Sequence, residues 1–156
     1  MQADVILIEV LNDLIEINND RIKCYAKASD ETKEVDSDLK AIFAILSKKS
    51  MRYVCELTQQ VVKVGGESAT AATNRGKIYR EWMEAKKAIA TNDRLAILQA
   101  CEIAEDAAQT AYEDTLATDA DINVEIRKLI VGQKLTLRGD YRLIKKYVEA
   151  HNVISI

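Results

Sequence analysis

The chain of 156 residues contains no proline and only five glycines. Tight turns depend on these two residue types, because proline fixes φ and glycine accepts a positive φ. A sandwich or a barrel needs many such turns, so these folds are nearly excluded. A chain with 48% apolar and 30% charged residues is ordinary for a globular protein and too polar for a membrane protein.

Apolar residues recur at steps of three and four along four long segments, which is the spacing of one face of a helix. The pattern predicts helices over residues 4–28, 37–64, 93–117 and 121–150. A shorter pattern predicts a further helix over residues 75–90. The polar or small residues between these segments are predicted to form links.

Several residues mark the expected helix ends. Asp36 or Ser37 is expected to cap the second long helix and Asp93 the third, because a side-chain oxygen there accepts from a free amide. Gly65 and Gly66 are expected to end the second helix, since glycine adopts the left-handed conformation without strain.

Each long segment has one apolar face, which predicts an all-α four-helix bundle formed by a single domain over residues 1–156. The link between the second and third long segments is far longer than a usual bundle loop and predicts one long crossover that carries the short extra helix. Gly132 and Gly139 lie seven residues apart on one face of the last segment, which predicts that another helix packs closely there.

Each long segment also has one polar residue at a position where the pattern predicts a buried side chain. These residues lie near the middle of their helices, about 20 Å from the helix start, so we expect them to meet in one central layer. Two tyrosines follow seven residues after members of the layer and are expected to donate to it. The predicted central polar layer comprises Asn18, Ser50, Glu105, Gln133, Tyr25 and Tyr112.

Two interpretations of this layer stay open. Buried polar groups are costly unless they satisfy one another, so the layer is interpreted first as a structural hydrogen-bond network that sets the helix register. The alternative is a metal or ligand site. Glu102, Glu105 and Asp106 form an acidic cluster that Asp20 or Glu56 could join to hold one hard cation, although exposed acids on a solvated face are the favoured explanation.

Four stretches carry a family resemblance: VLNDLIEINNDRIKCY (10–25), SMRYVCELTQQVVKVGGE (50–67), REWMEAKKAI (80–89) and ILQACEIAEDAAQTAYEDTL (97–116). With them the chain resembles a bacterial family of ferritin-like four-helix-bundle proteins catalogued as a domain of unknown function. The resemblance implies a ferritin-like fold. It implies no reaction, because that family has no assigned activity.

The wider ferritin-like superfamily is known for di-iron sites built from carboxylates and Glu-x-x-His pairs. The resemblance places Asn18 where the first helix would offer a glutamate, and it retains Glu105 on the third helix. In place of Glu-x-x-His, the second and fourth helices offer Ser47-x-x-Ser50 or Lys49-x-x-Arg52, and Gln133-x-x-Thr136. Amides and hydroxyls are poor iron ligands, and one carboxylate cannot balance two divalent ions. The resemblance therefore implies a degenerate di-iron site and no cofactor.

Charge and composition narrow the expected partners and location. A net charge of -3 argues against nucleic acid, and no segment approaches the ~20 apolar residues of a membrane span. The first residues are expected to begin a helix and not to be a signal peptide, so we expect a cytoplasmic protein. Cys24, Cys55 and Cys101 have no metal-type spacing and are expected to be buried thiols.

These observations predict a non-enzymatic protein with a structural or protein-association role, acting as a homo-oligomer or with a protein partner. The only histidine, His151, is predicted to lie in a C-terminal tail, so cysteine catalysis lacks a base. Trp82 and Tyr79 lie among cations on the short helix, where they either dock a partner or, as we favour, pack that helix onto the bundle. The alternative functions are a metal-binding or redox and stress-related protein that uses the carboxylate cluster, and a carrier of apolar ligands.

Overall fold

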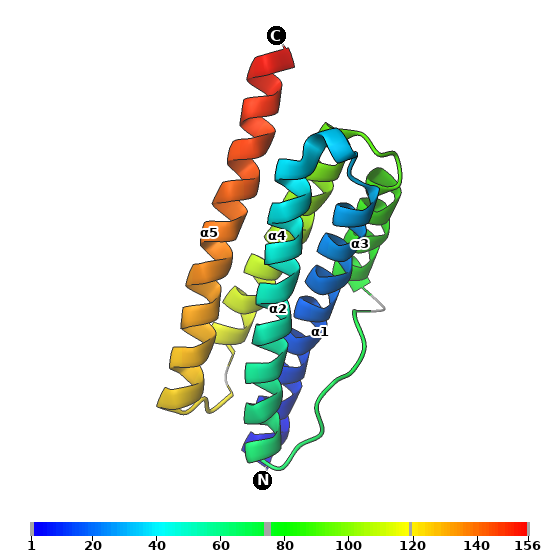
Figure 1. Ribbon diagram of the computed structural model, residues 1–156. Coiled ribbons are helices and arrows are strands. Elements are labelled where there is room, and N and C mark those ends of the chain that lie inside the picture. Colours follow the sequence, from blue (N-terminus) through cyan, green and yellow to red (C-terminus); the bar gives the residue numbers. More distant parts are fainter. Residues whose placement is uncertain (1, 74–75, 119, 156) are drawn as a thin grey trace.

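The computed structural model describes residues 2–73, 76–118 and 120–155. Over these residues the chain is all-α, with no strand among them, which confirms the predicted fold class (Figure 1). The elements are α1 (Gln2–Glu31), a 3-10 turn η1 (Glu34–Asp36), α2 (Ser37–Lys63), α3 (Gly76–Ile89), α4 (Arg94–Leu116) and α5 (Val124–Ser155). Within this described part, no helix is both long and apolar enough to cross a membrane.

The four long helices form a bundle in which α1 pairs with α2 and α4 pairs with α5 (Figure 1). The short helix α3 lies against α4 and α1, on the side of the bundle away from α5. Arg94 Nη1, at the start of α4, donates to Asp36 Oδ1 beside the start of α2 at 2.8 Å. The crossover that contains α3 therefore runs back along the length of the bundle, as its length predicts.

The end of α2 confirms the role predicted for its glycines. Gly65 has a φ of 84°, its amide donates to the carbonyl of Val62, and the amide of Gly66 donates to the carbonyl of Val61. These paired bonds close the helix in a left-handed turn. A Cβ at Gly66 would lie 2.8 Å from the side chain of Ile8, so the start of the crossover also passes close against α1.

The other helix ends match the predictions only in part. Asp93 caps α4, because its Oδ2 accepts from the amide of Ala96 at 2.9 Å. Asp36 stands at the cap position of α2 but makes no side-chain capping bond, since its carboxylate binds Arg94 instead. Helix α1 continues to Glu31, beyond its predicted end, so part of the expected link is helical.

The first part of the crossover is held along α1 by polar side chains of that helix. Asn12 Oδ1 accepts from the amide of Ala69 at 2.8 Å, and Asp20 Oδ1 accepts from the amide of Thr73 at 3.0 Å. Asn19 donates to a third backbone group of the same segment. These bonds satisfy loop groups that have no helical partner.

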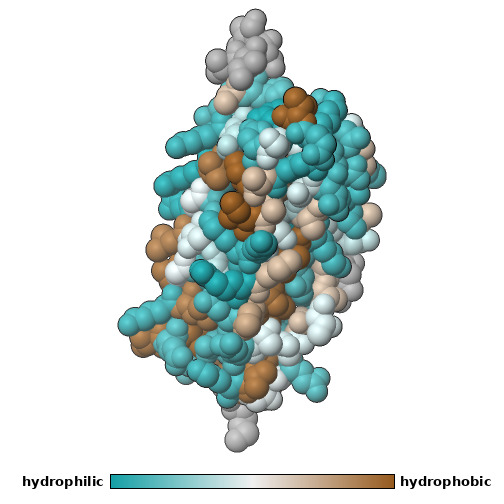
Figure 2. Space-filling model, in the orientation of Figure 1, coloured by the Kyte–Doolittle hydropathy of each residue, from teal (hydrophilic) through white to brown (hydrophobic). Residues whose placement is uncertain are grey.

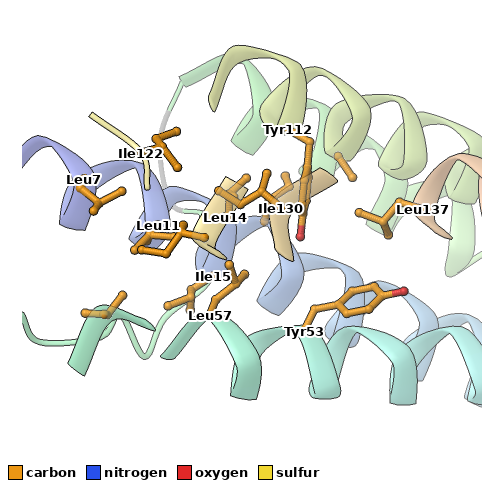
Figure 3. Packing of buried hydrophobic residues seen from close by; sticks show 14 of the residues in the cluster. Leu7, Leu11, Leu14, Ile15, Tyr53, Leu57, Tyr112, Ile122, Ile130 and Leu137 are labelled. Atoms are coloured by element: carbon orange, nitrogen blue, oxygen red, sulfur yellow. The ribbon is translucent and has the colours of Figure 1, made fainter. Parts of the chain in front are cut away.

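Among the described residues, the apolar core consists of two clusters, one at each end of the bundle. The lower cluster of Figure 1 contains the first half of α1, the second half of α2 and α4, and the first half of α5, including Leu7, Leu11, Leu14, Ile15, Leu57, Val61, Ile126 and Ile130 (Figure 3). The upper cluster joins the opposite helix ends to α3, including Cys24, Leu39, Phe43, Trp82, Ile89, Leu98 and Ile144. Trp82 therefore packs α3 onto the bundle, as favoured from the sequence.

Three predictions of detail are wrong. Gly132 and Gly139 are exposed, and a Cβ at either position would have no neighbour within 4 Å in the described part of the chain, so no helix packs closely there. Cys55 is exposed, although Cys24 and Cys101 are buried as expected. His151 belongs to α5 and not to a separate tail, because the last helix extends beyond its predicted end.

Candidate functional site

A buried ion pair stands at the centre of the bundle. Arg21 of α1 is 1% exposed and Glu105 of α4 is 0% exposed. Arg21 Nε donates to Glu105 Oε1 at 2.7 Å, and Arg21 Nη2 lies 2.6 Å from the same oxygen. The hydroxyl of Tyr25 donates to Oε1 as well, also at 2.7 Å. Two hydrogen-bond donors and a second guanidinium nitrogen thus converge on one carboxylate oxygen, an arrangement that favours its charged form.

The ion pair belongs to a chain of alternating charges with one residue from each long helix. Arg21 Nη2 lies 3.5 Å from Asp140 Oδ2 of α5, and Lys49 Nζ of α2 lies 2.9 Å from Asp140 Oδ1. Lys49 is 37% exposed, so the chain reaches the surface at this end. Two cations and two anions balance within the layer, which is the condition for burying them.

A second set of contacts links the same four helices through neutral groups. Arg21 Nη1 donates to Ser50 Oγ, and Ser50 Oγ donates to Asn18 Oδ1 at 3.0 Å. Asn18 Nδ2 donates to the hydroxyl of Tyr112 at 2.8 Å, and that hydroxyl donates to Gln133 Oε1 at 2.6 Å. The layer is therefore one continuous network from the ion pair to α5.

The network ends at the surface between α2 and α5. Gln133 Nε2 donates to Glu56 Oε1 at 3.2 Å. A cleft of about 250 Å³ opens beside these two residues, and its walls include Arg52, Tyr53 and Lys128. The neutral contacts and the charged contacts therefore both run from a buried centre to the α2–α5 side of the bundle.

Helical spacing places these side chains in one layer. Asn18, Arg21 and Tyr25 follow one another at steps of three and four, so they lie on one face of α1. Glu105 and Tyr112 are seven residues apart on α4, which is two turns on the same face. The clusters above and below fix the rotation of each helix by burying its apolar residues, and this rotation turns the polar residues inward.

Burial is the largest single influence on the pKa values of four ionisable groups of the layer, Arg21, Tyr25, Glu105 and Tyr112. Burial raises the pKa of Glu105, although Arg21 and Tyr25 partly oppose that rise. Burial lowers the pKa of Arg21, but Glu105 more than offsets this effect and leaves it above the ordinary value. Burial also raises the pKa values of Tyr25 and Tyr112, so both hydroxyls remain protonated donors.

All six residues of the predicted polar layer, Asn18, Ser50, Glu105, Gln133, Tyr25 and Tyr112, are buried and connected by these hydrogen bonds. The sequence reasoning missed Arg21, Asp140 and Lys49. The missed signal is spacing, because Arg21 lies three residues after Asn18, and Asp140 lies seven residues after Gln133. Charged residues at such positions are buried when they have partners on other helices.

The structure does not bring the alternative metal ligands together. Among the described residues, no group of three or more histidine, cysteine, aspartate or glutamate side chains could hold a metal ion. Glu105 binds Arg21, Glu56 binds Gln133, and Asp20 binds the crossover. Asp106 is exposed and Glu102 is half-buried on the outer side of α4.

The donor set of the central layer does not fit a di-iron centre. Glu105 is its only glutamate, and the guanidinium of Arg21 occupies the coordinating oxygen Oε1. Asn18, Ser50 and Gln133 offer neutral oxygens, which bind iron weakly compared with carboxylate and imidazole. A buried cation next to the carboxylate also opposes the approach of a second cation.

These features define the class of protein as an all-α helical bundle whose interior is crossed by an ion-paired polar network. A family model described as Domain of unknown function (DUF2383) matches residues 7–118 of the chain. The chain therefore belongs to this family. The match covers most of α1 and all of α2, α3 and α4, and it ends before α5. No curated protein matches the chain.

Proposed function

We propose that the chain is a non-enzymatic member of the ferritin-like bundles, in which the ligands of a metal centre have been replaced, and that it acts as a structural or protein-association module. The observation that carries the proposal is the Arg21–Glu105 pair. A guanidinium in the middle of the bundle supplies the positive charge that a metal would supply in a catalytic relative. Its contacts also reach Ser50 and Asp140, so one side chain joins all four long helices.

Energetics favour this assignment over the metal-binding alternative. A divalent ion at Glu105 would have to displace Arg21 and leave a buried guanidinium without its partner. Breaking a buried pair in this way costs about 3–5 kcal/mol. Asn18, Ser50 and Gln133 offer only neutral oxygens, and Asp140 is already paired with Lys49, so binding iron or manganese would regain little of that cost.

The cysteines support a proposed location in the cytoplasm. Cys24, Cys55 and Cys101 are all free thiols in the described structure. An odd number of cysteines without metal-type spacing is typical of proteins in a reducing compartment. We therefore place the protein in the cytoplasm, with a protein surface as its partner.

Metal analysis of the purified chain tests the proposal. We expect no metal to copurify in stoichiometric amount, and titration with Fe²⁺ or Mn²⁺ to give no tight binding. The variant Arg21→Met leaves Glu105 without its cation and serves as the matched comparison, because it offers the carboxylate to added metal. About one or two tightly held ions per wild-type chain would contradict the proposal.

A further inference from the structure

The neighbouring helices α4 and α5 carry surface charges of opposite sign, most of them exposed. Apart from the buried Glu105, the charged residues of α4 from Leu95 to Leu116 are all acidic: Glu102, Asp106, Glu113 and Asp114. The cations of α5 are Arg127, Lys128, Lys134, Arg138, Arg142, Lys145 and Lys146, and the only acid between them, Asp140, is buried in the layer. In the part of the chain that the structure describes, none of these surface charges forms an ion pair.

Spacing places most of these charges on one flank of each helix. Glu102, Asp106 and Glu113 follow at intervals of four and seven residues along α4. The cations Arg127, Lys134, Arg138 and Lys145 follow at intervals of seven, four and seven along α5. Such intervals keep side chains on the same side of a helix. Each helix therefore has a flank of a single sign.

The contacts of the central layer define which parts of the two flanks are level along the bundle. Tyr112 of α4 binds Gln133 of α5, and Glu105 of α4 faces Asp140 of α5 across Arg21. With a rise of about 1.5 Å per residue, Asp106 is level with Arg138 to within about 2 Å, and Glu113 is level with Lys134 to within about 3 Å. The opposite charges thus lie at matching heights.

We propose that the surface formed by α4 and α5 binds a second copy of this chain, an inference that rests on the proposed association role. A two-fold axis parallel to the helices preserves height and exchanges left for right. It places α5 of each copy against α4 of the other, so cations meet acids twice in one closed dimer. A two-fold axis perpendicular to the helices would instead bring α5 against α5, where seven cations repel one another.

The size and composition of this surface fit a dimer. A helix of 23 residues such as α4 is about 35 Å long, and two helices packed about 10 Å apart present roughly 700 Å². Standard interfaces bury about 800 Å² on each partner. Figure 2, which views the bundle with α2 in front and α5 at the left, shows brown apolar side chains among teal ones over α5. Val131 and Leu135 of α5 are 39% and 64% exposed. They supply the apolar part of a contact whose rim is charged.

The oligomeric state of the full chain tests the dimer by sedimentation or light scattering. We expect a dimer at about 50 mM salt that weakens at least tenfold at about 500 mM, because screening shortens the reach of surface charges. A wild-type chain that is monomeric at low salt overturns the proposal. An oligomer that does not respond to salt, or one larger than a dimer, overturns it too. None of these results depends on metal content, so they are separate from the test of the metal-free centre.

Charge inversion identifies the surface. The variant Lys134→Glu/Arg138→Glu reverses the two central charges of the α5 flank, and Asp106→Lys/Glu113→Lys reverses two of the three charges of the α4 flank. We expect each variant alone to be monomeric and an equal mixture of the two to form a heterodimer, since each inverted flank then meets its opposite. The control Lys128→Glu/Lys146→Glu changes the same charge on the flank of α5 towards α2 and should remain dimeric.

Circular dichroism confirms that each inverted variant keeps its helices. If an inverted variant is unfolded, Lys134→Gln/Arg138→Gln replaces it and should weaken the wild-type dimer at least tenfold. Inverted variants that stay monomeric when mixed, or that remain dimeric alone, show that another surface mediates association and overturn the proposal.

Discussion

The central polar layer and the two apolar clusters on either side of it hold the same four helices together by different means. The clusters gain stability from burying area, which has little directional preference. The layer is directional, because Arg21, Glu105 and Asn18 each need a partner at a particular place on another helix. Sliding one helix by a turn would leave apolar contacts largely intact but would break the layer. The clusters therefore supply most of the stability, and the layer selects the register.

Replacing one member of the Arg21–Glu105 pair is expected to have the largest effect on the free energy of unfolding, and it tests whether the layer selects the register or supplies stability. Glu105→Leu leaves the guanidinium of Arg21 buried without its carboxylate, so we expect a loss of about 3–5 kcal/mol in the free energy of unfolding. The reverse variant Arg21→Met should lose a similar amount. The double variant Arg21→Met/Glu105→Leu should recover most of the stability, because an apolar pair of similar volume avoids both desolvation costs.

Denaturant unfolding of the four proteins measures this cycle. If the double variant loses the sum of the two single losses, Arg21 and Glu105 are not energetically coupled, and the layer would not differ in kind from the clusters. The double variant also tests register, since a loosened register would reduce the dispersion of its amide NMR signals relative to the wild type.

Truncating a side chain of the lower apolar cluster is expected to lower the stability, and no second substitution is expected to restore it. Leu57 is 0% exposed, and Leu57→Ala should cost about 2–5 kcal/mol through lost burial and the cavity that remains. The control is Val62→Ala on the same helix, at a position 63% exposed, where we expect a change within about 0.5 kcal/mol. A small effect of Leu57→Ala would mean that the cluster is loosely packed and that the layer contributes more than we infer.

A buried carboxylate outside the layer gives a pH-dependent contrast with Glu105. Burial raises the pKa of Asp20 from 3.8 to about 6, while a hydrogen bond from Thr73 partly opposes the rise. The folded state therefore binds more protons than the unfolded state between about pH 4 and pH 6, and stability falls as the pH rises through this range. The variant Asp20→Asn keeps an oxygen for Thr73 but has no charge to bury.

We expect Asp20→Asn to remove the fall in stability between pH 4 and pH 6. At pH 7 the variant should be more stable than the wild type by about 1–2 kcal/mol. This value is smaller than the full pKa shift implies, because solvent reaches part of the site. Thermal unfolding between pH 4 and pH 7 measures the difference. Equal slopes for the two proteins would show that Asp20 ionises as an exposed carboxylate does.

The smallest expected effect compares two glycines. Gly132 is exposed in the middle of α5 with open space around it, so Gly132→Ala should stabilise the chain by about 0.5–1 kcal/mol. Gly65 has a φ of 84°, and Gly65→Ala should destabilise it by about 1 kcal/mol. Chemical denaturation resolves the opposite signs, and a loss of stability in Gly132→Ala would indicate a close contact at that position.

The sequence was sufficient for features that depend on local periodicity. Steps of three and four residues located the long helices, and the same steps identified Asn18, Ser50, Glu105 and Gln133 as inward-facing. The glycines after α2 and the cap at Asp93 were also predicted, because turns and caps depend on a few adjacent residues. These predictions needed no knowledge of which helices are neighbours.

Other features were decided only by the tertiary structure. Arginine is usually found at the protein surface. Nothing near Arg21 in the chain reveals that Glu105, 84 residues later, lies within hydrogen-bond distance. Gly132 and Gly139 suggested a close helix that is absent from the described structure, since glycine permits close approach without requiring it. A periodic pattern determines which face of a helix turns inward, whereas the partner of a buried charge depends on how remote helices are placed and on the high energy of leaving that charge alone.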